Sequence, residues 1–83
     1  MTTSQPQPAR DTLGRLATPE HLLSVVTQLA DKWRKHASGA ATAVTGEHRS
    51  MEFGMAAAYC QSLAILLDQP YNVVRESLEA GVL

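Results

Sequence analysis

Apolar residues recur along this chain at helical spacing, and no stretch has the alternation typical of a β-strand. The first series advances in steps of four, three and four, which places Leu22, Val26, Leu29 and Trp33 on one face of an α-helix. Thr18 is a good N-cap, and Pro19 suits the first helical position, where its missing N–H costs no hydrogen bond. With Ser38 and Gly39 as a stop signal, the pattern predicts a first helix over residues 18–37.

The most apolar part of the chain runs from residue 53 to residue 67 and predicts a second helix over 50–68. Its apolar positions cover most of the helix circumference, so more than one neighbour must cover them. The helix could begin after Thr45 or after Ser50, because both side chains can cap it. Residues 38–49 are predicted to be the connector.

Pro70 predicts a break followed by a third helix. The residue before a proline avoids the α region, and proline itself suits the start of a helix. Steps of three and four then follow, and Gly81 is a stop signal, so we expect this helix over 70–80; the steps join Tyr71, Val74 and Leu78. Val82 and Leu83 are expected to fold back onto the core. The predicted fold is all-α, an antiparallel helical hairpin with a short C-terminal helix.

The length of 83 residues limits how stable a single copy can be. Residues 1–12 are polar, hold two of the four prolines and are predicted to be a disordered tail, which leaves 13–83 as one small helical domain. Such a domain buries only about 60% of the surface of its unfolded chain. One Cys cannot form an internal disulfide, and no metal-ligand set is evident. We therefore expect a homodimer that completes a four-helix-type bundle.

The second helix is the expected seam of that dimer. One of its faces carries methionine, tyrosine and leucine, which suit protein interfaces. The candidate interface residues are Met51, Met55, Tyr59, Leu63 and Leu66. The predicted function is a non-enzymatic adaptor or oligomerisation module, with a second copy or another protein as its partner.

The chain is predicted to have no catalytic residue, no cofactor and no metal. Its candidate reactive side chains are His21, His36, His48 and Cys60, and Cys60 has no histidine close to it in the sequence. Within an apolar helix Cys60 is expected to be a small buried hydrophobe. The three histidines lie near polar helix ends and are expected to be solvated.

The charge distribution identifies where nucleic acid could bind. Residues 1–50 carry six Lys/Arg against four Asp/Glu, a net charge of +2, and residues 51–83 carry one Arg against four Asp/Glu, a net charge of −3. Any affinity for phosphates is therefore expected in the first half. The densest basic run comprises Lys32, Arg34 and Lys35, although the preferred interpretation is that they are solvated cations at the C-terminal end of a helix.

Residues 63–80 resemble a helix-turn-helix. They look like the GntR-type winged-helix regulators, with Asp68 at the position of the turn glycine; the matching residues are Leu63, Ala64, Leu67, Val74, Arg75, Glu76 and Leu78. The resemblance implies a recognition helix over 70–80 whose groove-reaching residues are Tyr71, Asn72 and Arg75. A small DNA-binding regulator is thus the alternative prediction.

A cytoplasmic location is expected for this chain. Its N-terminus lacks a basic region followed by an apolar one, and a single Cys suits a reducing compartment. The apolar run over residues 55–67 is shorter than the roughly 20 residues of a membrane span, and Gln61 and Ser62 interrupt it. No membrane partner is therefore predicted.

Overall fold

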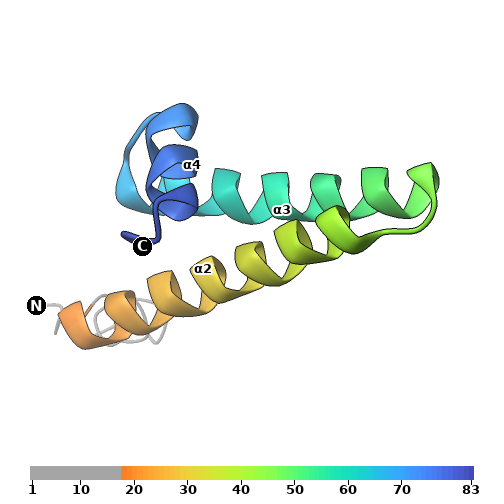
Figure 1. Ribbon diagram of the computed structural model, residues 1–83. Coiled ribbons are helices and arrows are strands. Elements are labelled where there is room, and N and C mark those ends of the chain that lie inside the picture. Colours follow the sequence, from red (N-terminus) through yellow and green to blue (C-terminus); the bar gives the residue numbers. More distant parts are fainter. Residues whose placement is uncertain (1–17) are drawn as a thin grey trace, which may run out of the picture.

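The structure is a computed structural model that describes residues 18–83. Within that range the chain forms three helices and no strand: α2 (Pro19–Thr42), α3 (Gly46–Leu67) and α4 (Tyr71–Glu79). In Figure 1, α2 and α3 form an antiparallel hairpin that opens away from its connector, and α4 lies across α3 at the open end. The all-α prediction of a hairpin with a short C-terminal helix is confirmed. The tail predicted over residues 1–12 lies outside the described residues.

Threonine side chains begin the two long helices. Thr18 Oγ1 accepts a hydrogen bond from the backbone N–H of His21 at 3.2 Å, and Pro19 takes the first helical position, as the sequence predicts. Thr45 Oγ1 accepts from the backbone N–H of His48 at 3.1 Å. The second helix therefore begins four residues before the predicted residue 50, at the earlier of its two candidate caps.

The connector predicted over residues 38–49 is wrong, because α2 continues to Thr42 and only residues 43–45 join the two helices. Gly39 lies inside α2 and does not end it. A Cβ atom at Gly39 would lie 2.9 Å from both Cδ and Oε2 of Glu52, which belongs to α3. The glycine therefore leaves room for a side chain of the neighbouring helix. From the sequence alone, a glycine in this role looks the same as a glycine that ends a helix.

Residues 68–70 form the turn between α3 and α4. Asp68 has a φ of 52°, in the left-handed region that residues with a Cβ atom rarely adopt. The backbone N–H of Gln69 donates to the carbonyl oxygen of Ala64 at 3.0 Å and closes the end of the helix. Pro70 then precedes α4, and Gly81, with a φ of 74°, follows it in the predicted stop position.

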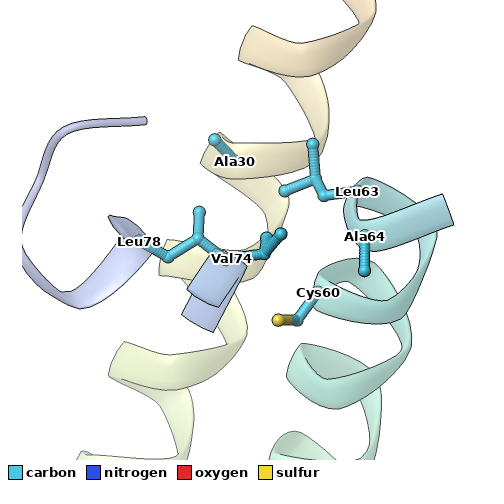
Figure 2. Close-up of a cluster of buried hydrophobic side chains, with 6 residues drawn as sticks. All are labelled: Ala30, Cys60, Leu63, Ala64, Val74 and Leu78. Carbon is cyan, nitrogen blue, oxygen red and sulfur yellow. The ribbon is translucent and has the colours of Figure 1, made fainter. Parts of the chain in front are cut away.

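The core lies where the three helices meet (Figure 2), and its buried members are Ala30, Cys60, Leu63, Ala64, Val74 and Leu78. Cys60 is a buried hydrophobe, as predicted. Leu83 packs against this cluster, as predicted, whereas Val82 is 79% exposed. Leu63 was expected on the dimer interface, but α2 and α4 cover it completely, so it cannot belong to an exposed face.

Leu63→Ala is expected to lower the free energy of unfolding by about 2–5 kcal/mol, because it leaves a cavity between three helices. The matched control is Leu23→Ala, since Leu23 is 67% exposed on α2 and its loss should cost less than about 1 kcal/mol. Urea denaturation followed by circular dichroism measures both values. Equal losses for the two variants would contradict this assignment of the core.

Candidate functional site

Helix α3 carries more apolar surface than α2 and α4 cover. Its buried residues are Ala56, Cys60, Leu63 and Ala64. Several of its large apolar side chains are exposed instead, among them Ile65 at 72%, Met51 and Phe53 at 57%, Met55 at 40% and Leu66 at 39%. These side chains are the main candidates for contact with another molecule, since several exposed large apolar side chains on one helix can mark a binding site.

The exposed apolar residues of α3 lie on two sides of the helix. Successive helical residues are about 100° apart, so Phe53 and Met55 point in nearly opposite directions. By the same rotation, four of these exposed residues point away from Cys60 and from the core. We call this side of α3 the outer face, and it comprises Met51, Met55, Ile65 and Leu66. Of the five residues predicted as the interface, three belong to this face, Tyr59 is half-buried at its edge, and Leu63 lies in the core.

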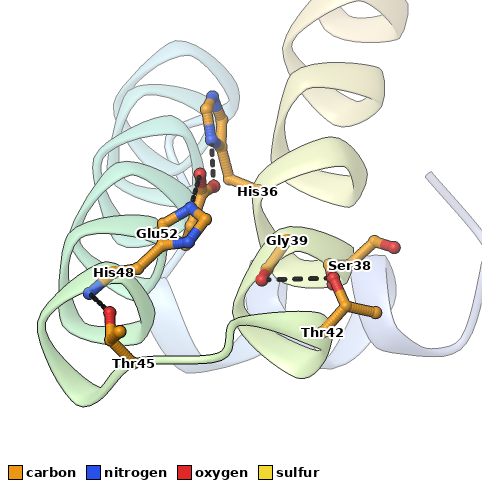
Figure 3. Close-up of polar contacts among 7 residues, drawn as sticks. All are labelled: His36, Ser38, Gly39, Thr42, Thr45, His48 and Glu52. Atoms are coloured by element: carbon orange, nitrogen blue, oxygen red, sulfur yellow. Dashed lines mark hydrogen bonds and ion pairs between the residues drawn. The ribbon is translucent and has the colours of Figure 1, made fainter.

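A polar cluster joins the two long helices near their connector (Figure 3). His36 Nδ1 of α2 lies 2.6 Å from Glu52 Oε2, and His48 Nε2 lies 3.2 Å from Glu52 Oε1. An ionised carboxylate only accepts hydrogen bonds, so both imidazoles donate to it. The ring of Tyr59 stacks on that of His36, with centroids 5.6 Å apart and planes 10° from parallel. Glu52 therefore links one histidine of each helix.

The prediction that all three histidines are solvated is wrong for His36, whose side chain is 14% exposed. The contact between His48 and Glu52 spans four residues, so sequence spacing could have revealed it. The contact between His36 and Glu52 spans 16 residues and depends on how the two helices align. No local pattern therefore indicated it.

The polar cluster stabilises the ionised form of Glu52. The hydrogen bond from His36 holds the pKa of Glu52 below its ordinary value of 4.5, against the opposing effect of burial. Within residues 18–83, no three side chains of His, Cys, Asp or Glu are arranged to hold a metal ion.

Burial raises the pKa of the Cys60 thiol, whose sulfur contacts the main-chain oxygen of Tyr71 at 3.8 Å. A thiol in that state is a poor nucleophile.

A groove of about 400 Å³ lies beside α4, on the other side of α3 from the outer face. Its lining is apolar apart from one charged pair, and it includes Trp33, Phe53, Ala57, Tyr71, Arg75 and Glu79. Arg75 Nε lies 3.8 Å from Glu79 Oε1, four residues further along α4. All three helices contribute residues to the groove, so the apolar pattern of any single helix could not predict it.

The residues predicted to contact nucleic acid fall into two groups. Lys32 and Lys35 are exposed on α2, while Arg34 donates to Asp31 at 3.1 Å and to the main-chain oxygen of Leu83. The other three residues are on α4, where Tyr71 and Arg75 line the groove and Asn72 is exposed.

Helix α3 as a whole, at 22 residues, is long and apolar enough to cross a membrane by length and composition alone. This helix is longer than the apolar run over residues 55–67, on which the prediction of no span rested. Core helices of soluble proteins meet the same criterion, although only 22% of the apolar window of α3 is buried here. The observation adds to the case that α3 needs a further cover.

The chain matches no protein-family model, no curated protein and no solved structure. Its function therefore has to be argued from the outer face, the polar cluster and the groove.

Glu52→Gln is expected to lower the free energy of unfolding at pH 7 and to make that free energy change less between pH 3 and pH 7. Because the folded pKa of Glu52 is lowered, its carboxylate stabilises the fold above pH 4.5, and this contribution is lost as pH falls through the lower folded value. Urea denaturation between pH 3 and pH 7 measures this, with Glu76→Gln, an exposed change on α4, as the control. Identical profiles for Glu52→Gln and the natural chain would contradict the role of the cluster.

Proposed function

We propose that this chain is a helical protein–protein interaction module that associates with a second copy of itself through the outer face of α3. One observation carries the proposal. The most apolar helix carries four large apolar side chains on its outer face that α2 and α4 leave exposed by 39–72%. Such a surface costs free energy in water, and covering it contributes roughly 25 cal/mol per Å².

The composition of the core supports the same proposal. The largest fully buried side chains are Leu63, Val74 and Cys60, and most other buried apolar residues are alanines. A core of so few large side chains gives a small domain limited stability. Burial of a further apolar face against a second copy adds to it.

The spacing along the outer side of α3 suits the packing of one helix against another. Steps of four, three, four and three residues connect positions on this side, the spacing of a two-helix seam; they join Met51, Met55, Ala58, Ser62 and Ile65. The small Ala58 and Ser62 in the middle allow two backbones to approach closely. A two-fold axis beside α3 would thus pair the two α3 helices, and the two α2 helices would complete a four-helix arrangement.

Met55→Asp and Leu66→Asp are each expected to convert a dimer into a monomer, because a charge at the seam would lose its hydration. Both side chains are about 40% exposed in one copy, so the helical content should persist. Val73→Asp is the matched control, since Val73 has a similar exposure of 42% but lies on α4. Sedimentation measures mass, and circular dichroism measures helicity.

A natural chain that is monomeric at micromolar concentration would contradict self-association. If that monomer binds phosphatidylcholine vesicles, and Met55→Asp abolishes the binding, a membrane covers the outer face instead. A dimer that survives both aspartate substitutions would place the seam elsewhere on the molecule.

DNA binding through residues 63–80 is the second candidate. The observation in its favour is the three-residue turn between α3 and α4, with Asp68 in the left-handed conformation that suits the glycine of the motif. Glu76 and Glu79 beside Arg75 weaken it, because acidic side chains repel phosphates.

A labelled mixed-sequence duplex at low salt tests this second candidate by fluorescence anisotropy. If α4 reads DNA, Arg75→Ala should weaken binding, and if α2 holds the backbone, Lys32→Ala and Lys35→Ala should weaken it. Binding should also fall steeply as salt rises, because each phosphate contact releases counterions. Absence of any binding at low salt would remove the candidate.

A further inference from the structure

We infer that α4 is a lid over one side of the hairpin, and that it opens about residues 68–70 while α2 and α3 stay folded and paired. Opening exposes the thiol of Cys60 and the side chain of Leu63, which are both fully buried when α4 is in place. The inference does not rest on the proposed self-association, because the outer face of α3 points away from Cys60.

Helix α4 is held against the hairpin mainly by two apolar side chains. It has nine residues, and the two that it buries, Val74 and Leu78, belong to the same buried cluster as Cys60 (Figure 2). Within residues 18–83, one hydrogen bond joins α4 to the two long helices, the 3.8 Å contact from the Cys60 sulfur to the main-chain oxygen of Tyr71, and no ion pair joins them. Thiols are weak donors, so polar contacts add little to this attachment.

The connector end of the hairpin has contacts that do not involve α4. His36 Nδ1 of α2 and Glu52 Oε2 of α3 are 2.6 Å apart there, and Ala40 is fully buried. The short connector over residues 43–45 keeps the ends of the two helices close together. These contacts can persist while α4 moves, so part of the chain can open at a lower free energy than the whole chain needs to unfold.

The turn over residues 68–70 has the properties of a hinge. Hinges are a few residues at the ends of elements that absorb changes in φ and ψ. Asp68 has a φ of 52°, and opening can release this left-handed conformation. Pro70 has no backbone N–H, and no side chain caps the start of α4, so few hydrogen bonds break when the turn moves.

One contact beyond α4 holds the lid in its closed position. The guanidinium of Arg34 on α2 donates to the main-chain oxygen of Leu83, and the Leu83 side chain packs against the buried cluster. The Arg34 side chain is 40% exposed, so its replacement removes this contact without leaving a cavity in the core. Arg34 therefore offers a variant that acts on the lid and leaves the hairpin intact.

Cys60 reports the opening directly, because it is the only cysteine of the chain and α4 lies over it. Dithiodipyridine, an uncharged disulfide, is added to the full chain, and the thiopyridone that the Cys60 thiolate displaces is measured. Rates proportional to reagent concentration show that opening precedes labelling as an equilibrium. The rate divided by that of the urea-unfolded chain is the fraction in which Cys60 is exposed. Circular dichroism in urea, at the same protein concentration, gives the fully unfolded fraction.

The exposed fraction should exceed the fully unfolded fraction about tenfold or more. It should also depend less steeply on urea, because opening exposes only part of the buried surface. Arg34→Gln should raise the exposed fraction about threefold or more through the lost hydrogen bond. Lys35→Gln is the matched control, since it removes the exposed neighbouring cation on α2, and it should leave the exposed fraction unchanged.

A change at the connector end should separate the two fractions. Ala40→Gly should raise the fully unfolded fraction about fivefold, because glycine is a poor helix former. It should leave the exposed fraction of Cys60 unchanged, since the connector end stays folded when α4 opens.

Equal exposed and unfolded fractions with the same urea dependence would overturn the inference, since Cys60 would then be reached only when the whole chain unfolds. Equal rises of both fractions in Ala40→Gly would do the same. Labelling that is fast but no different between Arg34→Gln and Lys35→Gln would also overturn it, because Cys60 would then be exposed by a movement other than that of the lid.

Discussion

The close approach of α2 and α3 is the constraint on which the rest of this structure depends. The buried positions on these helices are mostly small, with Ala30, Ala40 and Ala56 each exposed by 5% or less. Gly39 extends this pattern, because a methyl group there would lie 2.9 Å from the carboxyl end of the Glu52 side chain, which would have to shift. Helices that meet through small side chains pack closely, but they bury little apolar area in doing so.

The polar cluster follows from the same closeness. Glu52 lies beside Gly39 and contacts His36, and its side chain is 15% exposed with two imidazole donors. These donors stabilise a carboxylate that has lost part of its contact with water. The cluster thus holds the connector end of the hairpin, while Val74 and Leu78 of α4 close the open end.

Local signals explain why the three helices could be predicted from the sequence. Thr18 and Pro70 act on residues close to them in the sequence, so their effect could be predicted without the fold. The sequence left Thr45 and Ser50 as alternative caps, and the predicted start at residue 50 was wrong. Gly39 and Leu63 were misread because their roles depend on which helix lies opposite. For the same reason the groove and the contact between His36 and Glu52 could not be predicted, whereas the exposed methionines of the outer face needed only the helical period.

Tight packing through small residues also accounts for the large apolar side chains outside the core. If alanine and glycine occupy the contact between α2 and α3, the bulkier residues of α3 must lie on its other sides. They do so in two separate places, with Met55 on one side and Phe53 on the other. A dimer formed through the first side would therefore leave the second side exposed in both copies.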